Sequence, residues 1–255
     1  MSPILKRWFR VASRSMLASL MCMPFVGSLH LSPVNVASLA TIVRTSRCVA
    51  SPPPSLVANS LIAADNAHEI ITVEARAKSA TTASLELWTR AGVCYSLVGG
   101  PWSAELGRKG LSAHKSEGDG TTPSGTFGIG AVMYGILANP GVAYPYHDIV
   151  CGDWWDEASS SPMYNRFVHV GCGAPPPFGG DSEALWRVVP QYDYFAVIDY
   201  NTTPVIAGRG SAIFLHLSIG EPTAGCIALP RSALLTTLRW LRPNAHPVIV
   251  IGTAL

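Results

Sequence analysis

Residues 215–230 have the sequence LHLSIGEPTAGCIALP, which holds one histidine, His216, and ten residues later one cysteine, Cys226. The pattern predicts a strand that ends near His216 and a turn through SIGEPTAG. A cysteine among apolar residues can be a small buried hydrophobe, or it can be a nucleophile with the histidine as its base. The remainder of the chain has to separate these two interpretations.

The sequence on both sides of this stretch is typical of a mostly β domain. Short apolar or alternating runs, separated by Gly, Thr and Ser, predict strands at 68–75, 83–89, 92–99, 126–136, 194–200, 211–219 and 246–252. One helix is predicted at 230–242, with Pro230 at its first helical position and Leu234, Leu235, Leu238 and Leu241 on one face. Arg90, Ala91 and Gly92 are expected to connect two strands of a hairpin.

Charge is scarce and unevenly placed. Charged residues make up 13% of the chain, against about 25% in typical soluble domains. Six of the 18 basic residues precede the first acidic residue, Asp65, which leaves 12 basic against 16 acidic residues from there on, a net charge of −4. With no basic patch interleaved with aromatic residues, we expect no nucleic-acid partner.

The N-terminus has the pattern of an export signal. A basic segment, KRWFRVASR, precedes 16 residues that are largely apolar, and Ser38 and Ala40 are small residues suited to a cleavage site. We predict a signal peptide or an uncleaved anchor at 1–40, a flexible linker at 41–66 and one catalytic domain at 67–255. The protein is therefore expected to be exported, to the cell wall or periplasmic space or into the medium, with any membrane contact made through this N-terminal segment.

An exported chain meets oxidising conditions, so pairing of the cysteines is expected. Cys151 and Cys172 flank a segment rich in Gly, Trp and Pro and are a plausible disulfide, although connectivity does not follow from sequence alone. Cys94 lies in a predicted strand and is expected in the core. The chain has no zinc-ligand spacing, and we predict no metal site.

The residues around Cys226 suit acyl transfer through a thioester. A cysteine acts as its thiolate, and a neighbouring imidazole or a helix N-terminus lowers its pKa. If the strands flanking the turn are adjacent, His216 and Cys226 come together. Gly225 allows close approach of a substrate, and the amides of Gly225 and Cys226 could bind the oxyanion of a tetrahedral intermediate.

A second segment, DGTTPSGTFGIG at 119–130, lies about a hundred residues upstream. Its Thr122-Pro123-Ser124-Gly125-Thr126-Phe127, together with His216 and the later Thr223-Ala224-Gly225-Cys226, resembles the L,D-transpeptidase catalytic domain, or YkuD, family. The resemblance extends over roughly residues 68–252. It is closest to an actinobacterial-type branch with a long aromatic insert.

This resemblance implies a mixed-sheet β-sandwich and a peptidoglycan L,D-transpeptidase that needs no cofactor. The Cys226 thiolate would attack the L-to-D peptide bond of a stem tetrapeptide and release D-alanine, and an amine of a neighbouring stem would then take the acyl group in a 3→3 crosslink. His216 would be the general base, oriented by a main-chain carbonyl, and Gly225 and Cys226 would form the oxyanion hole. The family relationship also implies acylation by carbapenem-type inhibitors.

The chain departs from the family pattern beside the nucleophile. Ala224 stands where the family has His or Arg, and Ala228 stands where it has Arg. The ten-residue spacing between histidine and cysteine is also shorter than usual. Substrate recognition must then use other groups, and the segment at 138–182, which is crowded with Pro, Gly and aromatic residues, is the natural place to look.

Eight residues are candidates for substrate binding: Thr122, Ser124, Thr126, His147, Trp154, Trp155, Tyr164 and Thr223. The alternatives stay open. The Thr122–Thr126 turn can instead shape the cleft, and His147 can be a loop histidine bonded to Asp148 or to the backbone. Neighbouring tryptophans in a strand face opposite sides, so one of the pair is expected in the core. The nearby acidic residues are expected to be solvated, and His169 to be structural.

Three other functions remain open at this point. An L,D-carboxypeptidase results if water replaces the amine. A sortase-like cysteine transpeptidase would need an arginine beside the thiol, and residues 223–229 hold none. A non-catalytic wall-binding module that keeps the fold is favoured slightly by Ala224 and Ala228, whereas retention of both Cys226 and His216 argues against it.

Overall fold

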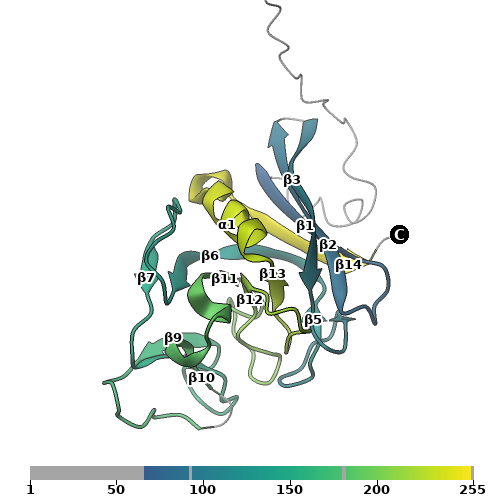
Figure 1. Cartoon of the computed structure of the whole chain (residues 1–255). Helices are drawn as coiled ribbons and strands as arrows, with labels where there is room; N and C mark the ends of the chain where they lie inside the picture. The colour runs from purple at the N-terminus through teal and green to yellow at the C-terminus, as the bar shows by residue number, and fades with distance from the viewer. Residues whose placement is uncertain (1–65, 92–93, 180–181, 254–255) are drawn as a thin grey trace, which may run out of the picture. The chain divides into compact units, whose positions relative to one another are not determined.

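The computed structural model of the chain describes residues 66–91, 94–179 and 182–253 (Figure 1). The predicted signal at 1–40 and nearly all of the predicted linker at 41–66 lie outside these residues, as does the tip of the hairpin at 92–93. Among the residues that are described, no helix is long and apolar enough to cross a membrane.

The described chain is mostly β with one α-helix, α1 (Arg231–Trp240), as the sequence predicts. Its strands are β1 (Glu69–Ala75), β2 (Thr82–Ala91), β3 (Cys94–Glu105), β4 (Leu111–Ser112), β5 (Thr122–Pro123), β6 (Gly125–Gly135), β7 (Tyr146–Asp148), β8 (Asp153–Asp156), β9 (Arg166–His169), β10 (Glu183–Ala184), β11 (Phe195–Ile198), β12 (Phe214–Leu217), β13 (Ile227–Leu229) and β14 (Val248–Thr253). Short 3-10 turns are η2 (Leu185–Arg187), η3 (Gln191–Asp193) and η4 (Pro243–Ala245).

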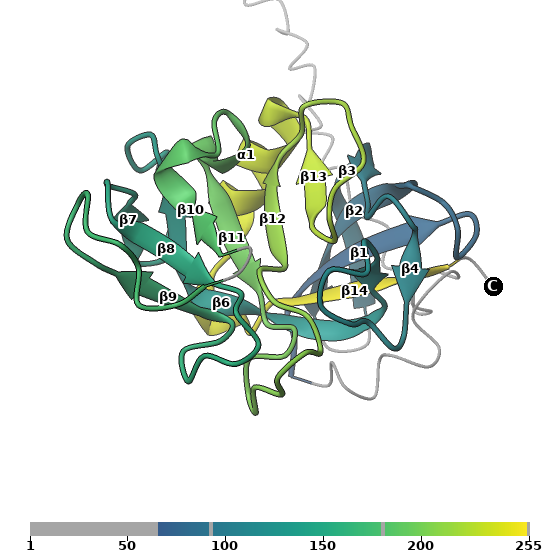
Figure 2. The same cartoon turned by 90° about the horizontal axis from the view of Figure 1, so that it is seen from below.

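The main sheet is mixed and has the order β11-β12-β13-β3-β2-β1-β14-β6-β7. An additional antiparallel pairing of β6 with β11 closes eight of its strands into a ring, and β7 is attached to this ring beside β6. Two neighbouring pairs in the ring are parallel, β1 with β14 and β12 with β13. Figure 2 shows β11, β12, β13 and β3 side by side in this order.

The principal core lies inside this ring. Successive strand residues point to opposite faces, so Leu215 and Leu217 of β12 and Ile227 and Leu229 of β13 point inward together. Fully buried aliphatic side chains of the other strands complete this cluster. Burying each such side chain contributes about 1.5–3 kcal/mol, which makes the cluster the main source of stability.

Helix α1 covers part of the same core through Ala233, Leu234 and Leu238. The prediction of a helix here is confirmed, but Pro230 was expected at the first helical position and instead precedes it. Its ψ of 145° is extended, so the first helical residue is Arg231. Pro230 therefore lies between the last residue of β13 and the first residue of α1.

The opposite face of β11 and β12 carries a second cluster. Phe195 and Phe214 point outward here and are buried by Trp155, Leu185 and Tyr192. These three residues come from the chain between β7 and β11, which includes the small antiparallel sheet β10-β8-β9. In Figure 1 this small sheet lies below β11–β13, and α1 lies above them. The chain between β7 and β11, which includes much of the long segment predicted at 138–182, thus covers one face of the main sheet and is called the cover below.

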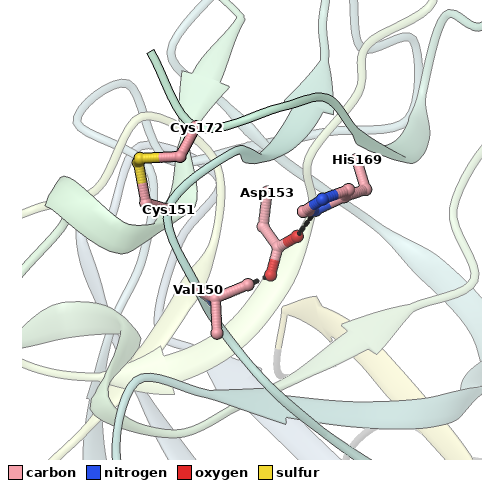
Figure 3. Close-up of a disulfide and its surroundings, with 5 residues drawn as sticks. All are labelled: Val150, Cys151, Asp153, His169 and Cys172. Carbon is pink, nitrogen blue, oxygen red and sulfur yellow. Dashed lines mark hydrogen bonds and ion pairs between the residues drawn. A yellow bond between two sulfur atoms is a disulfide. The ribbon is translucent and has the colours of Figure 1, made fainter. Parts of the chain in front are cut away.

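The predicted Cys151–Cys172 disulfide is confirmed, and it joins the connection between β7 and β8 to the chain that follows β9 (Figure 3). Beside it, Asp153 is fully buried and accepts hydrogen bonds from the Val150 amide at 2.8 Å and from the ring of His169 at 2.6 Å. Cys94 begins β3, but the surroundings of its side chain lie outside what the structure describes.

Candidate active site

His216 and Cys226 lie on the same face of two adjacent strands. β12 and β13 pair in parallel, with Leu215 opposite Ile227 and His216 opposite Ala228. Cys226 comes just before β13 and is level with Phe214, whose amide donates to the Cys226 sulfur at 3.3 Å. Since side chains alternate along a strand, both His216 and Cys226 point outward, into the cover rather than into the ring. The strands on either side of the turn are therefore adjacent, as was expected for a paired His216 and Cys226.

The thiol of Cys226 is buried, with 7% of the residue exposed. It donates a hydrogen bond to the Ala212 carbonyl at 3.1 Å. Ala212 has a φ of 51°, a left-handed conformation that is rare outside glycine and that shortens the predicted strand at 211–219 to β12. Burial raises the pKa of the Cys226 thiol, and the charge of Glu183 adds to this rise. At rest the thiol is protonated and neutral.

His216 is equally buried, and its ring is oriented by a main-chain carbonyl, as the family resemblance implies. Nδ1 donates to the Leu217 carbonyl oxygen at 2.9 Å. A carbonyl only accepts, so the proton is assigned to Nδ1, and Nε2 keeps its lone pair. Burial lowers the pKa of His216 to about 4. The imidazole is thus neutral and able to accept a proton at neutral pH. Among the described contacts, no hydrogen bond joins it to Cys226.

Two threonine hydroxyls hold the backbone of Cys226. Thr223 Oγ1 donates to the Cys226 carbonyl oxygen at 2.7 Å, and Thr122 Oγ1 lies 3.3 Å from the same oxygen. The Gly107 amide donates to Thr122 Oγ1 at 2.8 Å. Thr122 is fully buried, so its hydroxyl supports the cysteine loop and is not open to a substrate.

The Gly225 amide, a predicted oxyanion donor, is bonded to Thr223 Oγ1 at 3.1 Å in this structure. It must release this hydroxyl before it can serve an oxyanion. A Cβ at Gly225 would lie 2.9 Å from the Thr121 carbonyl oxygen and 3.0 Å from Lys115 Nζ, so only glycine fits here. Ser124 and Thr126 belong to the adjoining β5–β6 segment and do not line the cavities at Cys226.

Cys226 lies where two cavities meet. The larger, of about 720 Å³, also has Arg108, Lys115 and Glu157 in its wall. The smaller, of about 220 Å³, contains His216, Tyr192 and Thr223 in its wall. Three residues line both cavities: Glu183, Ala224 and Cys226. Ala224 contributes only a methyl group to both walls.

Glu183 and Lys115 line the cavities at Cys226 and were not predicted from the sequence. Glu183 lies opposite Trp155 in the β8–β10 pairing, which carries it to Cys226 from the cover. Lys115 is buried and donates to Asp119 and to the Thr121 carbonyl, each at 2.9 Å. Its charge lowers the pKa of Cys226, against the larger effect of burial. No motif in the sequence marks Glu183. The signal for Lys115 was its position four residues before the DGTTP segment at 119–123.

Of four predicted substrate residues, Trp154, Trp155 and Tyr164 lie in the cover and His147 lies in β7, and none of the four lines either cavity at Cys226. Trp155 is buried edge-on against Phe214, and Trp154 packs on the other side against Trp186, so the predicted division of this pair is confirmed. Tyr164 is buried and donates to Glu117, a residue in the wall of the larger cavity. Tyr164 therefore lies behind that wall, in contact with it through Glu117.

The fourth, His147, contacts Asp153 through Nε2 at 2.8 Å, whereas the alternative to substrate binding named Asp148 or the backbone as its partner. His169 contacts the other oxygen of the same carboxylate, which agrees with the predicted structural role (Figure 3). The expectation of a solvated acidic stretch is wrong for Asp153 and Asp156, because both are fully buried. No group of three or more His, Cys, Asp or Glu side chains in the described part of the chain is arranged to hold a metal ion.

Taken together, the fold and the site define a mixed β domain with a cysteine and a histidine on one sheet face, at the meeting point of two cavities. The family model of the L,D-transpeptidase catalytic domain, YkuD, matches residues 83–250. This match covers more than half of the chain, and the chain belongs to that family. No curated protein and no solved structure matches it.

Proposed function

We propose that the protein is a peptidoglycan L,D-transpeptidase that forms 3→3 crosslinks through a thioester on Cys226. The observation that carries this proposal is the position of Cys226, which shares a sheet face with His216 and lines both cavities. A transfer between two stem peptides needs such a meeting point, because donor and acceptor must reach one sulfur in turn. The family supplies the class of reaction and of substrate, the stem peptides of peptidoglycan.

In the first step the thiol leaves the Ala212 carbonyl and gives its proton to Nε2 of His216. The sulfur attacks the carbonyl carbon before the D-alanine of a stem tetrapeptide, and the amides of Gly225 and Cys226 bind the oxyanion. The C–N bond then breaks, and the imidazolium returns the proton to the leaving amine of D-alanine. The neutral pair at rest suits this order, because the proton moves only when substrate is present.

In the second step an amine of another stem attacks the thioester, forms the new amide and frees Cys226. Water in place of the amine would give an L,D-carboxypeptidase with the same first step. Export follows the same logic, since the substrate lies outside the membrane, and we propose residues 1–40 as its signal or anchor. Carbapenem-type inhibitors are proposed to acylate Cys226 in the manner of the donor.

The test is incubation of the purified full chain with a disaccharide-tetrapeptide, followed by mass spectrometry beside Cys226→Ala. Loss of D-alanine with dimer formation, abolished by the substitution, is expected. Loss of D-alanine without dimer would assign the carboxypeptidase instead. No turnover by a folded protein would contradict both activities.

One observation favours a second candidate, a wall-binding module without activity. The thiol is buried, neutral and hydrogen-bonded to Ala212. Such a module would bind the tetrapeptide without forming an adduct, and Cys226→Ala would bind it equally well.

A further inference from the structure

We propose that Glu183 is a further catalytic residue of this site, the base that takes a proton from the acceptor amine before that amine attacks the thioester. This inference rests on the proposed function. Three features of Glu183 support it: its position in both cavity walls, its hydrogen bond from Tyr192 and the charges of the residues around it.

Glu183 lies at the reacting sulfur. It is one of the three residues shared by the two cavities, and the other two are Cys226 itself and Ala224, which has no polar side chain. Among the described residues, Glu183 and the nucleophile Cys226 are thus the two that line both cavities and can carry a proton on their side chains. An acceptor in either cavity therefore faces a wall that contains this carboxyl.

The carboxyl is held in place from two directions. Its backbone pairs with β8, where the opposite residue, Trp155, is buried against Phe214. Tyr192 donates its hydroxyl to Glu183 Oε2. The Tyr192 ring in turn packs edge-on against the ring of His216, with 5.6 Å between ring centroids. Glu183, Tyr192 and His216 therefore form one connected wall beside Cys226.

Tyr192 donates to Oε2 of Glu183, and no donor to the other carboxyl oxygen, Oε1, is seen among the described residues. Burial raises the pKa of Glu183, which brings its basicity closer to what a base needs at neutral pH. The same burial makes an ionised carboxylate here seek a cation.

The smaller cavity suits an ammonium group. Glu183 and Glu221 lie in its wall, and none of its described lining residues is a lysine or an arginine. The acceptor of a crosslink is a primary amine that is protonated at neutral pH and cannot attack in that form. A carboxylate at the meeting point of the cavities attracts this ammonium ion and removes its proton at the place of reaction.

Glu183 takes one proton from the ammonium ion, and the freed amine nitrogen forms a bond to the thioester carbon while the carbonyl electrons move to oxygen. His216 takes the second proton from this nitrogen. When the C–S bond breaks, the sulfur leaves with its electron pair and receives that proton back, which restores the neutral pair. Glu183 then releases its proton to solvent.

The experiment separates the two half-reactions in the full chain. Wild type, Glu183→Gln and Tyr192→Phe are first loaded with a tetrapeptide donor, and acylation is measured by D-alanine release and by intact mass. An acceptor stem is then added, and transfer to its amine is measured. Glutamine can still accept the Tyr192 hydroxyl, so Glu183→Gln should fold and acylate within about threefold of wild type. Its transfer to the amine should fall by about 10²-fold or more.

The pH dependence identifies the role. Loss of a base matters most where the amine is protonated, so the deficit of Glu183→Gln should shrink as pH rises toward the pKa of the amine. A merely structural role predicts a deficit that pH does not alter. Tyr192→Phe should show a smaller deficit with the same trend. Glu221→Gln removes the same charge from the same cavity, and it should raise KM for the acceptor while sparing the rate at saturating amine.

Two results would overturn the inference: equal slowing of acylation and transfer in Glu183→Gln, or transfer at the wild-type rate. Absence of an acyl-enzyme in wild type would instead refute the proposed function, and the base role with it. Alkylation of Cys226 by iodoacetamide, read by peptide mass spectrometry, tests the placement separately. Removing the Glu183 charge should move its pH midpoint downward, and an unchanged midpoint would contradict the placement.

Discussion

Replacing Thr122 by valine tests whether the TPSG segment supports the cysteine loop or binds substrate. Thr122 is fully buried, and its hydroxyl joins the Gly107 amide to the Cys226 carbonyl. Valine has nearly the same shape and lacks the hydroxyl. The Cys226 carbonyl keeps its bond from Thr223, so the principal loss is the partner of the buried Gly107 amide.

A buried donor left without a partner costs about 1–3 kcal/mol. We therefore expect Thr122→Val to lower the free energy of unfolding by about 2 kcal/mol, measured by urea titration. For a chain of this size that change corresponds to a fall in Tm of about 4–8 °C. Thr122→Ser is the matched control, because it keeps the hydroxyl and loses a methyl group, at about 1 kcal/mol.

Acylation of Cys226 by the donor should also slow in Thr122→Val, because the backbone that carries the nucleophile is less firmly held. The decrease should appear in kcat more than in KM. A variant as stable as wild type whose sole defect is a raised KM for the donor would refute the supporting role and make Thr122 a substrate contact.

Three further predictions concern the histidine, the disulfide and inhibitor binding. Burial lowers the pKa of His216 to about 4, so the unfolded state binds more protons than the folded state between about pH 4 and pH 6.5. The free energy of unfolding should therefore rise with pH across this window by up to about 3 kcal/mol. Urea titrations at several pH values should show that His216→Gln removes most of this rise. Replacing Cys151 and Cys172 by serine should cost about 2–4 kcal/mol, seen as a lower urea midpoint; an unchanged midpoint under oxidising conditions would mean that the bond does not form. A carbapenem should add its full mass to the peptide that contains Cys226, and acylation retained in Cys226→Ala would exclude this thiol as the target.

The strands were predictable because their signal is local. Alternation and apolar runs depend on the strand itself, and the predicted segments correspond to β1, β2, β3, β6, β11, β12 and β14 with shifts at their ends. β3 runs six residues beyond its predicted end, and β12 begins three residues after its predicted start. The late start of β12 follows the left-handed conformation of Ala212, which nothing in its side chain indicates. The β6–β11 pairing that closes the ring joins residues about 60 positions apart and has no local signature.

The site was predictable only where a short motif carried it. His216 and Cys226 were found from their own residues and from the family pattern. The aromatic residues of the cover were predicted as substrate contacts because a long loop is often functional, yet Trp155 and Tyr164 are buried behind the cavity walls. Glu183 was missed because its position depends on the β8–β10 pairing, which brings a residue type that is usually exposed into the cavity walls at Cys226.

The most direct test of the account is the intact mass of the full chain mixed with a tetrapeptide donor and stopped within the first turnover. The account predicts a gain equal to the donor minus D-alanine, located on Cys226 and lost in Cys226→Ala, with slower formation in His216→Gln. A folded wild-type protein that binds the donor and gains no mass would contradict Cys226 as nucleophile and leave the wall-binding module as the function.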